Sequence, residues 1–494
     1  MHKKPFFIIS LIFLFFSCEK TDLNLNDSST NDKVNFFVWR GLNTYYLWQK
    51  EVPDLADDRF SNLNDLYSYF RKYNTPNDVF YDLLYQYPTI DRFSWIVDDY
   101  IALENSFLGV NVTNGMEFGL VRYLNDRSKL FGYVRYVVPN SDAEDKGVLR
   151  GMIFNKVDGL QLTESNYQGL LFGTVTNYTI ELADYNSGNP VSNTTTINLT
   201  KSEIEENPIK IQKVFKEGNK NIGYLMYNQF ARNYNSQLNA AFANFKSENI
   251  DELIVDLRYN SGGSTNTATY LGSMITGQFN NQLYSKEQWN ARVTNALPND
   301  RFINNFTSEI RSFDNSGNLI AQESIESLGL SKVYFIVTGS SASASELVIN
   351  SLSAYIDVKL VGTKTVGKQV GSVTLYDADN WAKNGTNFNN NHTYALQPIV
   401  FEIFNKDNQN YPDGIIPGTT LPGIQIGEDF GNLGVLGNRN EPLLSRTIEY
   451  ILTGSKTLPR KNYSNFEEIY NSKLASPASD KLYIDYNSRK LKIN

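Results

Sequence analysis

The sequence predicts a multidomain chain of α+β and α/β class, in which a helical domain comes first, a β-rich domain second and an α/β domain last. Apolar residues recur at helical spacing over residues 34–105 and alternate in short runs over 106–205. Over 206–460, continuous apolar strands alternate with helical segments, as they do in a sheet covered on both faces. The 494 residues also exceed one compact core, since domains commonly hold about 100–200 residues.

Residues 1–18 have the layout of an export signal. A basic start is followed by the apolar run Pro5–Ser17 and then by Cys18, the only cysteine. The run is too short for a membrane-spanning helix, which needs about 20 residues. Leu14–Cys18 resembles the lipobox of a bacterial lipoprotein, which implies a lipid anchor on Cys18 in the cell envelope, on the periplasmic or surface side of a Gram-negative outer membrane. The alternative is an ordinary signal peptide with an incidental cysteine. Residues 19–33 are polar and predict a flexible tether.

The charge and the rarest residues exclude several kinds of function. The net charge is −8 with both signs interspersed, so nucleic acid is not an expected partner. A single cysteine allows neither an intramolecular disulfide nor a cysteine-based metal site. His2 lies in the export signal, and His392 lies in an Asn-rich run that predicts an exposed loop. We therefore expect no histidine base, no metal and no cofactor.

The segment 34–105 predicts a small helical domain. Its aromatic and leucine residues, such as Phe37, Leu42 and Tyr46, recur every three to four positions. Such a stripe indicates a helical core rather than a cofactor site, and Pro53 and Pro76 mark breaks between helices.

The segment 106–205 resembles a PDZ domain. The resemblance rests on 138–153, where a strand, a short helix and a glycine turn follow each other, and on Val157-Asp158-Gly159. Upstream, Phe118-Gly119-Leu120 is similar to the loop whose backbone amides receive the terminal carboxylate of a peptide. The resemblance implies polypeptide partners with free C-termini, bound as an added strand. A generic small β-sandwich is the alternative.

A candidate nucleophile lies where a strand meets a helix. The strand Val333–Val337 is followed by small residues that open a helix near 345–355, and Ser343 stands at that opening. A turn of this kind exposes a side chain beside the free amides of the first helical turn. Taken alone, serine at a helix start is more often a cap.

Ser343 needs a base. With His392 unsuited, carboxylates and a lysine of depressed pKa remain. Lys368 lies 25 positions after Ser343, beyond the strand Val358–Val361. A parallel strand reached through one helix would bring its amine back to the same sheet edge, where burial would lower its pKa. Without Ser343 in the sequence, we would interpret Lys368 as an exposed lysine in a loop.

Paired glycines close another predicted strand, 252–257. Gly262 and Gly263 follow it in the run Asp256-Leu257-Arg258-Tyr259-Asn260-Ser261. Glycines let backbone amides approach a ligand closely, which suits an oxyanion hole, although tight turns are their commoner use.

These segments, in this order, resemble peptidase family S41. The matching motifs are Asp-Leu-Arg-x-Asn-x-Gly-Gly, Ser-Ala-Ser-Ala-Ser-Glu and Thr-x-Gly-Lys, with a PDZ-like segment upstream. The resemblance implies a serine endopeptidase of the C-terminal processing type with a ClpP/crotonase-like α/β core. By residue, it implies Ser343 as nucleophile, Lys368 as general base, Glu346 as a supporting polar residue, and the amides of Ala344, Gly262 and Gly263 as the oxyanion hole.

The chain departs from the family pattern beside the lysine. Many members carry Gln four positions later, where this chain has Ser372, while Gln369 follows Lys368 directly. The residue that orients Lys368 is therefore open. Residues after Gly454 are polar, and we expect the C-terminal extension 461–494 to be peripheral. A catalytically silent peptide-binding lipoprotein is the alternative from another class. A penicillin-binding enzyme is disfavoured because the mature sequence lacks Ser-x-x-Lys.

Overall fold

The computed structural model describes residues 30–313, 318–457, 466–477, 479 and 481–484. The predicted export signal, with Cys18, lies outside these residues, as does most of the predicted tether. Residues 30–33 of that tether belong to the first helix, α1 (Thr30–Tyr45), so the tether prediction is wrong at its end. Among the described residues, no helix is both long and apolar enough to span a bilayer.

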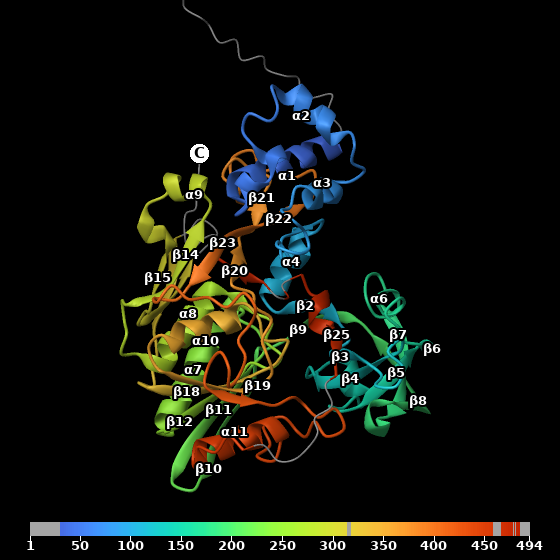
Figure 1. The fold of residues 1–494 in the computed structure, drawn as a ribbon, viewed down its shortest axis with the longest axis vertical. Helices are drawn as coiled ribbons and strands as arrows, with labels where there is room; N and C mark the ends of the chain where they lie inside the picture. Colours follow the sequence, from blue (N-terminus) through green and yellow to red (C-terminus); the bar gives the residue numbers. More distant parts are fainter. Residues whose placement is uncertain (1–29, 314–317, 458–465, 478, 480, 485–494) are drawn as a thin grey trace, which may run out of the picture.

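The N-terminal domain is helical, as its periodicity predicts. Figure 1 shows it at one end of the molecule, in blue. Its elements are α1, α2 (Leu63–Phe70), α3 (Pro76–Asp82), β1 (Trp95–Val97) and α4 (Tyr100–Phe107), with short 3-10 turns at Gln49–Glu51 and Pro53–Leu55. The start of α3 follows from sequence: Thr75 caps the helix and Pro76 occupies its first turn, where a missing N–H costs nothing. Phe37, Tyr45 and Tyr46 are fully buried.

The second domain is a β-sheet with a core of its own. Its strands are β2 (Val110–Thr113), β3 (Met116–Arg122), β4 (Leu130–Val137), β5 (Ile153–Val157), β6 (Leu160–Gln161), β7 (Asn177–Asp184), β8 (Val191–Thr200) and β9 (Ser202–Glu205), with helices α5 (Asp142–Asp145) and α6 (Tyr167–Leu171). The main sheet has the order β25-β3-β4-β5-β7-β8, with β6 paired to β5, and its β25 (Glu468–Asn471) comes from the C-terminal extension; β2 and β9 form a separate two-stranded sheet. The expected loop at Phe118-Gly119-Leu120 is wrong, because these residues lie inside β3.

The third domain is built on a six-stranded, mainly parallel sheet. Its order is β10-β11-β12-β18-β19-β24, and every pair from β11 to β24 is parallel. The strands are β10 (Ile209–Glu217), β11 (Lys220–Tyr227), β12 (Glu252–Asp256), β18 (Lys332–Val337), β19 (Asp357–Gly362) and β24 (Gly423–Gln425). One face packs on α7 (Asn235–Ser247), α8 (Thr265–Thr276) and α10 (Ala344–Ser353), and the other on α11 (Pro442–Thr453). Both faces are buried, which is why these strands read as continuous apolar runs.

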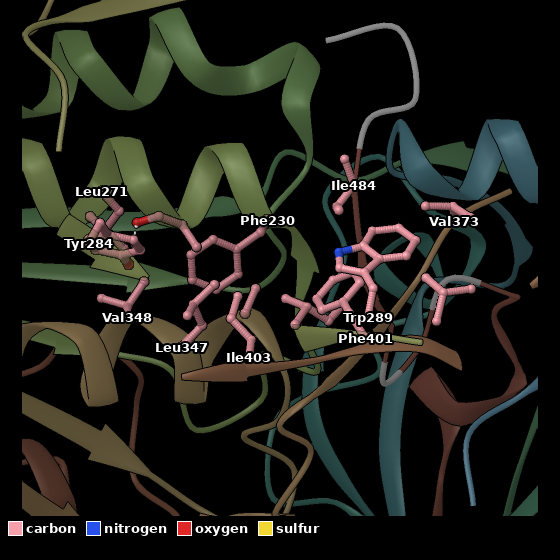
Figure 2. Packing of buried hydrophobic residues seen from close by; sticks show 14 of the residues in the cluster. Phe230, Leu271, Tyr284, Trp289, Leu347, Val348, Val373, Phe401, Ile403 and Ile484 are labelled. Atoms are coloured by element: carbon pink, nitrogen blue, oxygen red, sulfur yellow. Dashed lines mark hydrogen bonds between the residues drawn. The ribbon is translucent and has the colours of Figure 1, made fainter. Parts of the chain in front are cut away.

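A second six-stranded sheet lies beside α10, in the order β13-β26-β20-β23-β14-β15. Its strands are β13 (Gly263–Ser264), β14 (Leu283–Trp289), β15 (Ile303–Asn305), β20 (Val370–Ser372), β23 (Ile399–Phe404) and β26 (Leu482–Tyr483). Smaller elements complete the chain: α9 (Ala291–Ala296), β16 (Glu309–Phe313), β17 (Leu319–Ser324), β21 (Leu375–Tyr376) and β22 (Ala395–Gln397). Figure 2 shows Ile403 of this sheet beside Leu347 of α10, with Trp289 and Phe401 further along the same cluster. The expectation of a peripheral extension is wrong, since β26 is buried within this sheet.

Candidate active site

Ser343 occupies a strained turn between β18 and α10. Its backbone has φ 64° and ψ −114°, values that a residue with a β-carbon rarely adopts. Strain of this kind costs about 1–3 kcal/mol and persists only where the surroundings impose it. They do so here: the Ala342 amide donates to the Asn260 carbonyl at 3.2 Å, and the Ser345 hydroxyl donates to the same oxygen at 3.0 Å.

The Ser343 side chain is buried, and its hydroxyl is not engaged in a hydrogen bond with the described residues. The residue is 1% exposed. It lies against Gly262, since a β-carbon placed on that glycine would be 2.7 Å from Oγ. Gly262 therefore leaves the space that the Ser343 hydroxyl fills.

Lys368 reaches the same place from the neighbouring strand. β19 pairs in parallel with β18, and the segment after it returns to the nucleophile turn, where the Val366 amide donates to the Ser341 carbonyl at 3.1 Å. Lys368 is 1% exposed, and it borders, with Ser343, a cavity of about 20 Å³. The predicted crossover thus brings the two residues together.

Glu346 joins the two segments. Its carboxylate accepts hydrogen bonds from the amides of Ser343 (2.9 Å), Gly367 (2.7 Å) and Lys368 (2.8 Å), and from the Thr365 hydroxyl. Burial raises the pKa of this carboxyl above its usual range, while the four hydrogen bonds oppose the rise. Glu346 is a positioning residue, because it holds the nucleophile turn and the lysine loop at a fixed separation.

The predicted oxyanion donors differ in what their amides do. The Ala344 amide is in the first turn of α10, where an amide has no partner within the helix. The Gly262 amide donates to Asn260 Oδ1 at 2.9 Å, within its own loop. The Gly263 amide donates at 2.8 Å to the carbonyl of Lys481, in the C-terminal extension. Of the two glycine amides, only that of Gly263 meets a carbonyl from outside the loop.

Two family models match segments that contribute to this site. The family model for peptidase family S41 matches residues 221–389, and the model for the S41 N-terminal domain matches 33–95. Residues 33–95 and 221–389 thus match two domains of peptidase family S41. A carboxy-terminal-processing protease of Bartonella bacilliformis is 25% identical over 276 residues, which are 54% of this chain and 52% of that protein. A protein described as a CtpA-like serine protease of Staphylococcus epidermidis is 24% identical over 177 residues, 36% of this chain.

These curated relatives are longer than the part that matches. The chain spans 31% of the Staphylococcus protein and about half of the Bartonella protein. Among solved structures, an S41 protease from Bacteroides fragilis superposes with a TM-score of 0.60, at 22% identity, over 85% of this chain and 97% of that one. This likeness shows that the whole S41 fold is present.

A buried ion cluster supports the turn that carries Ser343. Arg258 is fully buried and binds Asp256 at 2.7 Å and Glu441 at 2.6 Å. Burial alone would lower the pKa of Arg258, but these carboxylates raise it well above its ordinary value. The Arg258 carbonyl accepts from the Thr338 hydroxyl, so the cluster fixes the end of β18. The Asp-Leu-Arg motif therefore has a structural role, which its sequence did not reveal.

The helical domain also contributes to the site. The Phe93 ring lies 4.9 Å from Lys368 Nζ, and the Arg92 guanidinium donates to the Gly367 carbonyl at 3.2 Å. Sequence reasoning missed both residues, because no motif marks them. Ser372, where the family has Gln, instead donates from its hydroxyl to the Leu482 carbonyl at 3.3 Å.

His392 lies in another environment. Its Nε2 is 3.2 Å from the Asp377 carboxylate, its ring is 6.0 Å from that of Phe37, and its side chain is 6% exposed. The expectation of an exposed loop side chain is wrong, because the helical domain packs against it.

Proposed function

We propose that this protein is a serine endopeptidase in which Ser343 is the nucleophile and Lys368 the general base. The observation that carries the proposal is the enclosed, unbonded Ser343 Oγ, in a strained turn, bordering the same cavity as a buried lysine. Strained turns of this kind cluster at active sites, and burial disfavours the charged form of a lysine, as a base requires.

The reaction proceeds by acyl transfer. Lys368 takes the proton of Ser343 Oγ, which attacks the carbonyl carbon of a peptide bond. The amides of Ala344 and Gly263 stabilise the oxyanion that develops. Lys368 then gives its proton to the departing amine, leaving an acyl-enzyme. A water molecule, deprotonated by Lys368, hydrolyses this ester and restores Ser343.

The test uses residues 19–494 with an unstructured protein such as a casein as substrate. We expect Ser343→Ala and Lys368→Ala to abolish cleavage while leaving the thermal unfolding midpoint within a few degrees of wild type. Ser312→Ala and Lys383→Ala, at exposed positions, are matched controls that keep activity. If wild type cleaves no faster than the two active-site variants, the peptidase proposal is refuted.

We further propose that substrates are recognised at their C-terminus along the edge of β3, in the PDZ-like domain. The support is that this edge already pairs with a strand, β25, and that a cavity of about 470 Å³ beside it is lined by Phe118, Phe172 and Ser261, the neighbour of Gly262. A carboxylate that loses its hydrogen bonds loses about 1.5–3 kcal/mol. Amidating a substrate's C-terminus should therefore lower kcat/KM by roughly 10- to 100-fold. Equal rates for free and amidated peptides would refute this recognition.

Membrane attachment through Cys18 is also a proposal, supported by the sequence of residues 1–18. In a Gram-negative host, we expect wild type to incorporate labelled palmitate and to sediment with outer membranes. Cys18→Ala should do neither; palmitate incorporation that persists in this variant would refute lipidation at Cys18.

A further inference from the structure

The C-terminal extension enters the catalytic sheet. β26 pairs in parallel with β13 on one side and with β20 on the other. β13 begins at Gly263, and β20 begins two residues after Lys368. β26 therefore fills the slot between the strand that carries an oxyanion donor and the strand that follows the base.

The backbone of this segment lies at the nucleophile. The Lys481 carbonyl accepts from the Gly263 amide at 2.8 Å, and the Ile484 amide donates to the Ser372 carbonyl at 3.3 Å. A β-carbon on Gly262 would lie 3.0 Å from the Lys481 carbonyl oxygen and 2.7 Å from Ser343 Oγ. A carbonyl of the chain itself thus packs against the same glycine as the hydroxyl, and it is held by an amide that a substrate carbonyl would use.

The side chains of the segment fill pockets formed with the helical domain. Leu482, Tyr483 and Ile484 are at most 2% exposed. The Tyr483 ring stacks on Phe107 at 4.0 Å between centroids, and Lys481 Nζ lies 3.6 Å from the ring centroid of Trp95. Figure 2 shows Ile484 on the Trp289 and Val373 side of the buried cluster.

The same extension also covers the β3 edge. β25 pairs antiparallel with β3, and Ser472 Oγ accepts from the Phe118 amide at 2.8 Å. Glu468 of β25 binds the buried Arg135 at 2.6 Å. One segment of the chain thus lies on the proposed recognition edge and, further along, in the proposed cleavage slot. An extended peptide added to sheet edges binds in this way.

We propose that the C-terminal extension is an intramolecular competitor of the substrate, so that the full-length protein rests with its slot occupied by β26. This inference depends on the proposed function for its substrate. The occupant also indicates what the slot accepts: an extended segment with a basic residue followed by leucine, an aromatic residue and isoleucine. A polypeptide substrate has to displace β26 before its own carbonyl can reach Ser343.

The test compares two truncations of the 19–494 chain. Ending the chain after Ser479 removes β26, whereas ending it after Ile484 retains β26 and is the matched control. If β26 fills the slot nine-tenths of the time, its removal raises kcat/KM for casein about tenfold, because apparent affinity scales with the free fraction. The control truncation should match the full chain. The full-length variant Leu482→Ala/Tyr483→Ala should also be more active, and it covers the case in which the shorter chain does not fold.

A binding measurement separates this inference from the proposed function. A fluorescein-labelled peptide with the sequence of residues 479–486 is titrated, by anisotropy, into Ser343→Ala chains with and without β26. We expect binding to the chain ending at Ser479 and at least tenfold weaker binding to the full chain. Peptide binding without cleavage by any form would refute the peptidase and leave the competitor in place. Unchanged or lower kcat/KM in folded chains lacking β26 would overturn the competitor and leave the peptidase in place.

Discussion

Replacing Gly262 by alanine should disable Ser343 directly. The new β-carbon would lie 2.6 Å from the Ser343 β-carbon and 2.7 Å from its Oγ, so the nucleophile has to move. Gly262 also has φ 115°, where a residue with a β-carbon is strained by about 1–3 kcal/mol. Overpacking of a buried contact adds about 1–3 kcal/mol. We therefore expect Gly262→Ala to lose about 2–6 kcal/mol of unfolding free energy.

The effect on activity should exceed the effect on folding. A displacement of about 1 Å at a reacting group can lower the rate 100-fold, so kcat/KM of the folded variant should fall at least that far. Gly218→Ala is the matched control: its φ is 61°, and nothing lies within 4 Å of the added carbon. The control should lose only the backbone contribution of about 1–2 kcal/mol and keep its activity.

A double-mutant cycle assigns the loss to the contact with Ser343. In a Ser343→Gly background, the two Ser343 atoms that the new carbon would strike are absent, so Gly262→Ala should cost about 1–3 kcal/mol less than in wild type. Urea unfolding followed by circular dichroism measures all four chains. If the cost of Gly262→Ala is the same in both backgrounds, the close packing of Gly262 on Ser343 is refuted.

Three other perturbations test the surroundings of the site. Arg258→Met should cost about 3–5 kcal/mol of unfolding free energy, measured in urea, because it leaves Asp256 and Glu441 buried without their partner. Arg59→Met, in an exposed ion pair, should cost about 0–1 kcal/mol, and equal costs would contradict the buried network. Burial alone would raise the pKa of Glu428, but Arg150 and Arg258 hold it below its ordinary 4.5. The ion pairs of Glu428 therefore stabilise the fold fully above that pH, and their contribution is lost as the pH falls. Glu428→Gln should flatten the decline in stability between about pH 5 and 3, and an unchanged slope would refute the pairing. Phe93→Leu removes the ring 4.9 Å from Lys368 Nζ, so the amine loses the packing that holds it and kcat/KM should fall, whereas the same change at Phe60, over Arg59, should leave kcat/KM unchanged.

The sequence pattern predicts that Ser343 and Lys368 lie close together, for a topological reason. A crossover between parallel strands is right-handed and returns the chain to the same sheet edge. That rule puts Lys368 near Ser343 once both strands are recognised, and β18 and β19 are indeed neighbours. The partners of Glu346 could not be predicted in the same way. Spacing places Glu346 one helical turn from Ser343. It does not predict that the Glu346 carboxylate accepts hydrogen bonds from the amides of Gly367 and Lys368.

The errors concern segments whose environment is supplied by distant parts of the chain. Phe118-Gly119-Leu120 was expected as a loop, yet β4 and β25 pair with it on both sides. His392 lies in a polar run, but Phe37 of the helical domain packs against its ring. A local sequence pattern does not show which distant residues will pack against a segment and bury it.

The burial of the C-terminal extension is the feature that the sequence predicts least well. Leu482, Tyr483 and Ile484 form an apolar run too short to establish a strand by periodicity, within a polar segment. Their burial depends on a slot between β13 and β20, strands that are more than a hundred residues apart in sequence. An unpaired strand edge readily binds another strand, and β26 pairs with the edges of both β13 and β20.

The helical domain completes this slot. Phe93 faces the ammonium of Lys368, while Trp95 and Phe107 contact Lys481 and Tyr483 of the segment in the slot. A chain restricted to residues 206–460 would keep Ser343, Lys368 and Glu346 but lose these aromatic surfaces. Since one domain supplies both the ring that contacts Lys368 and the rings that contact the occupant, it links what the slot binds to the setting of the proposed base.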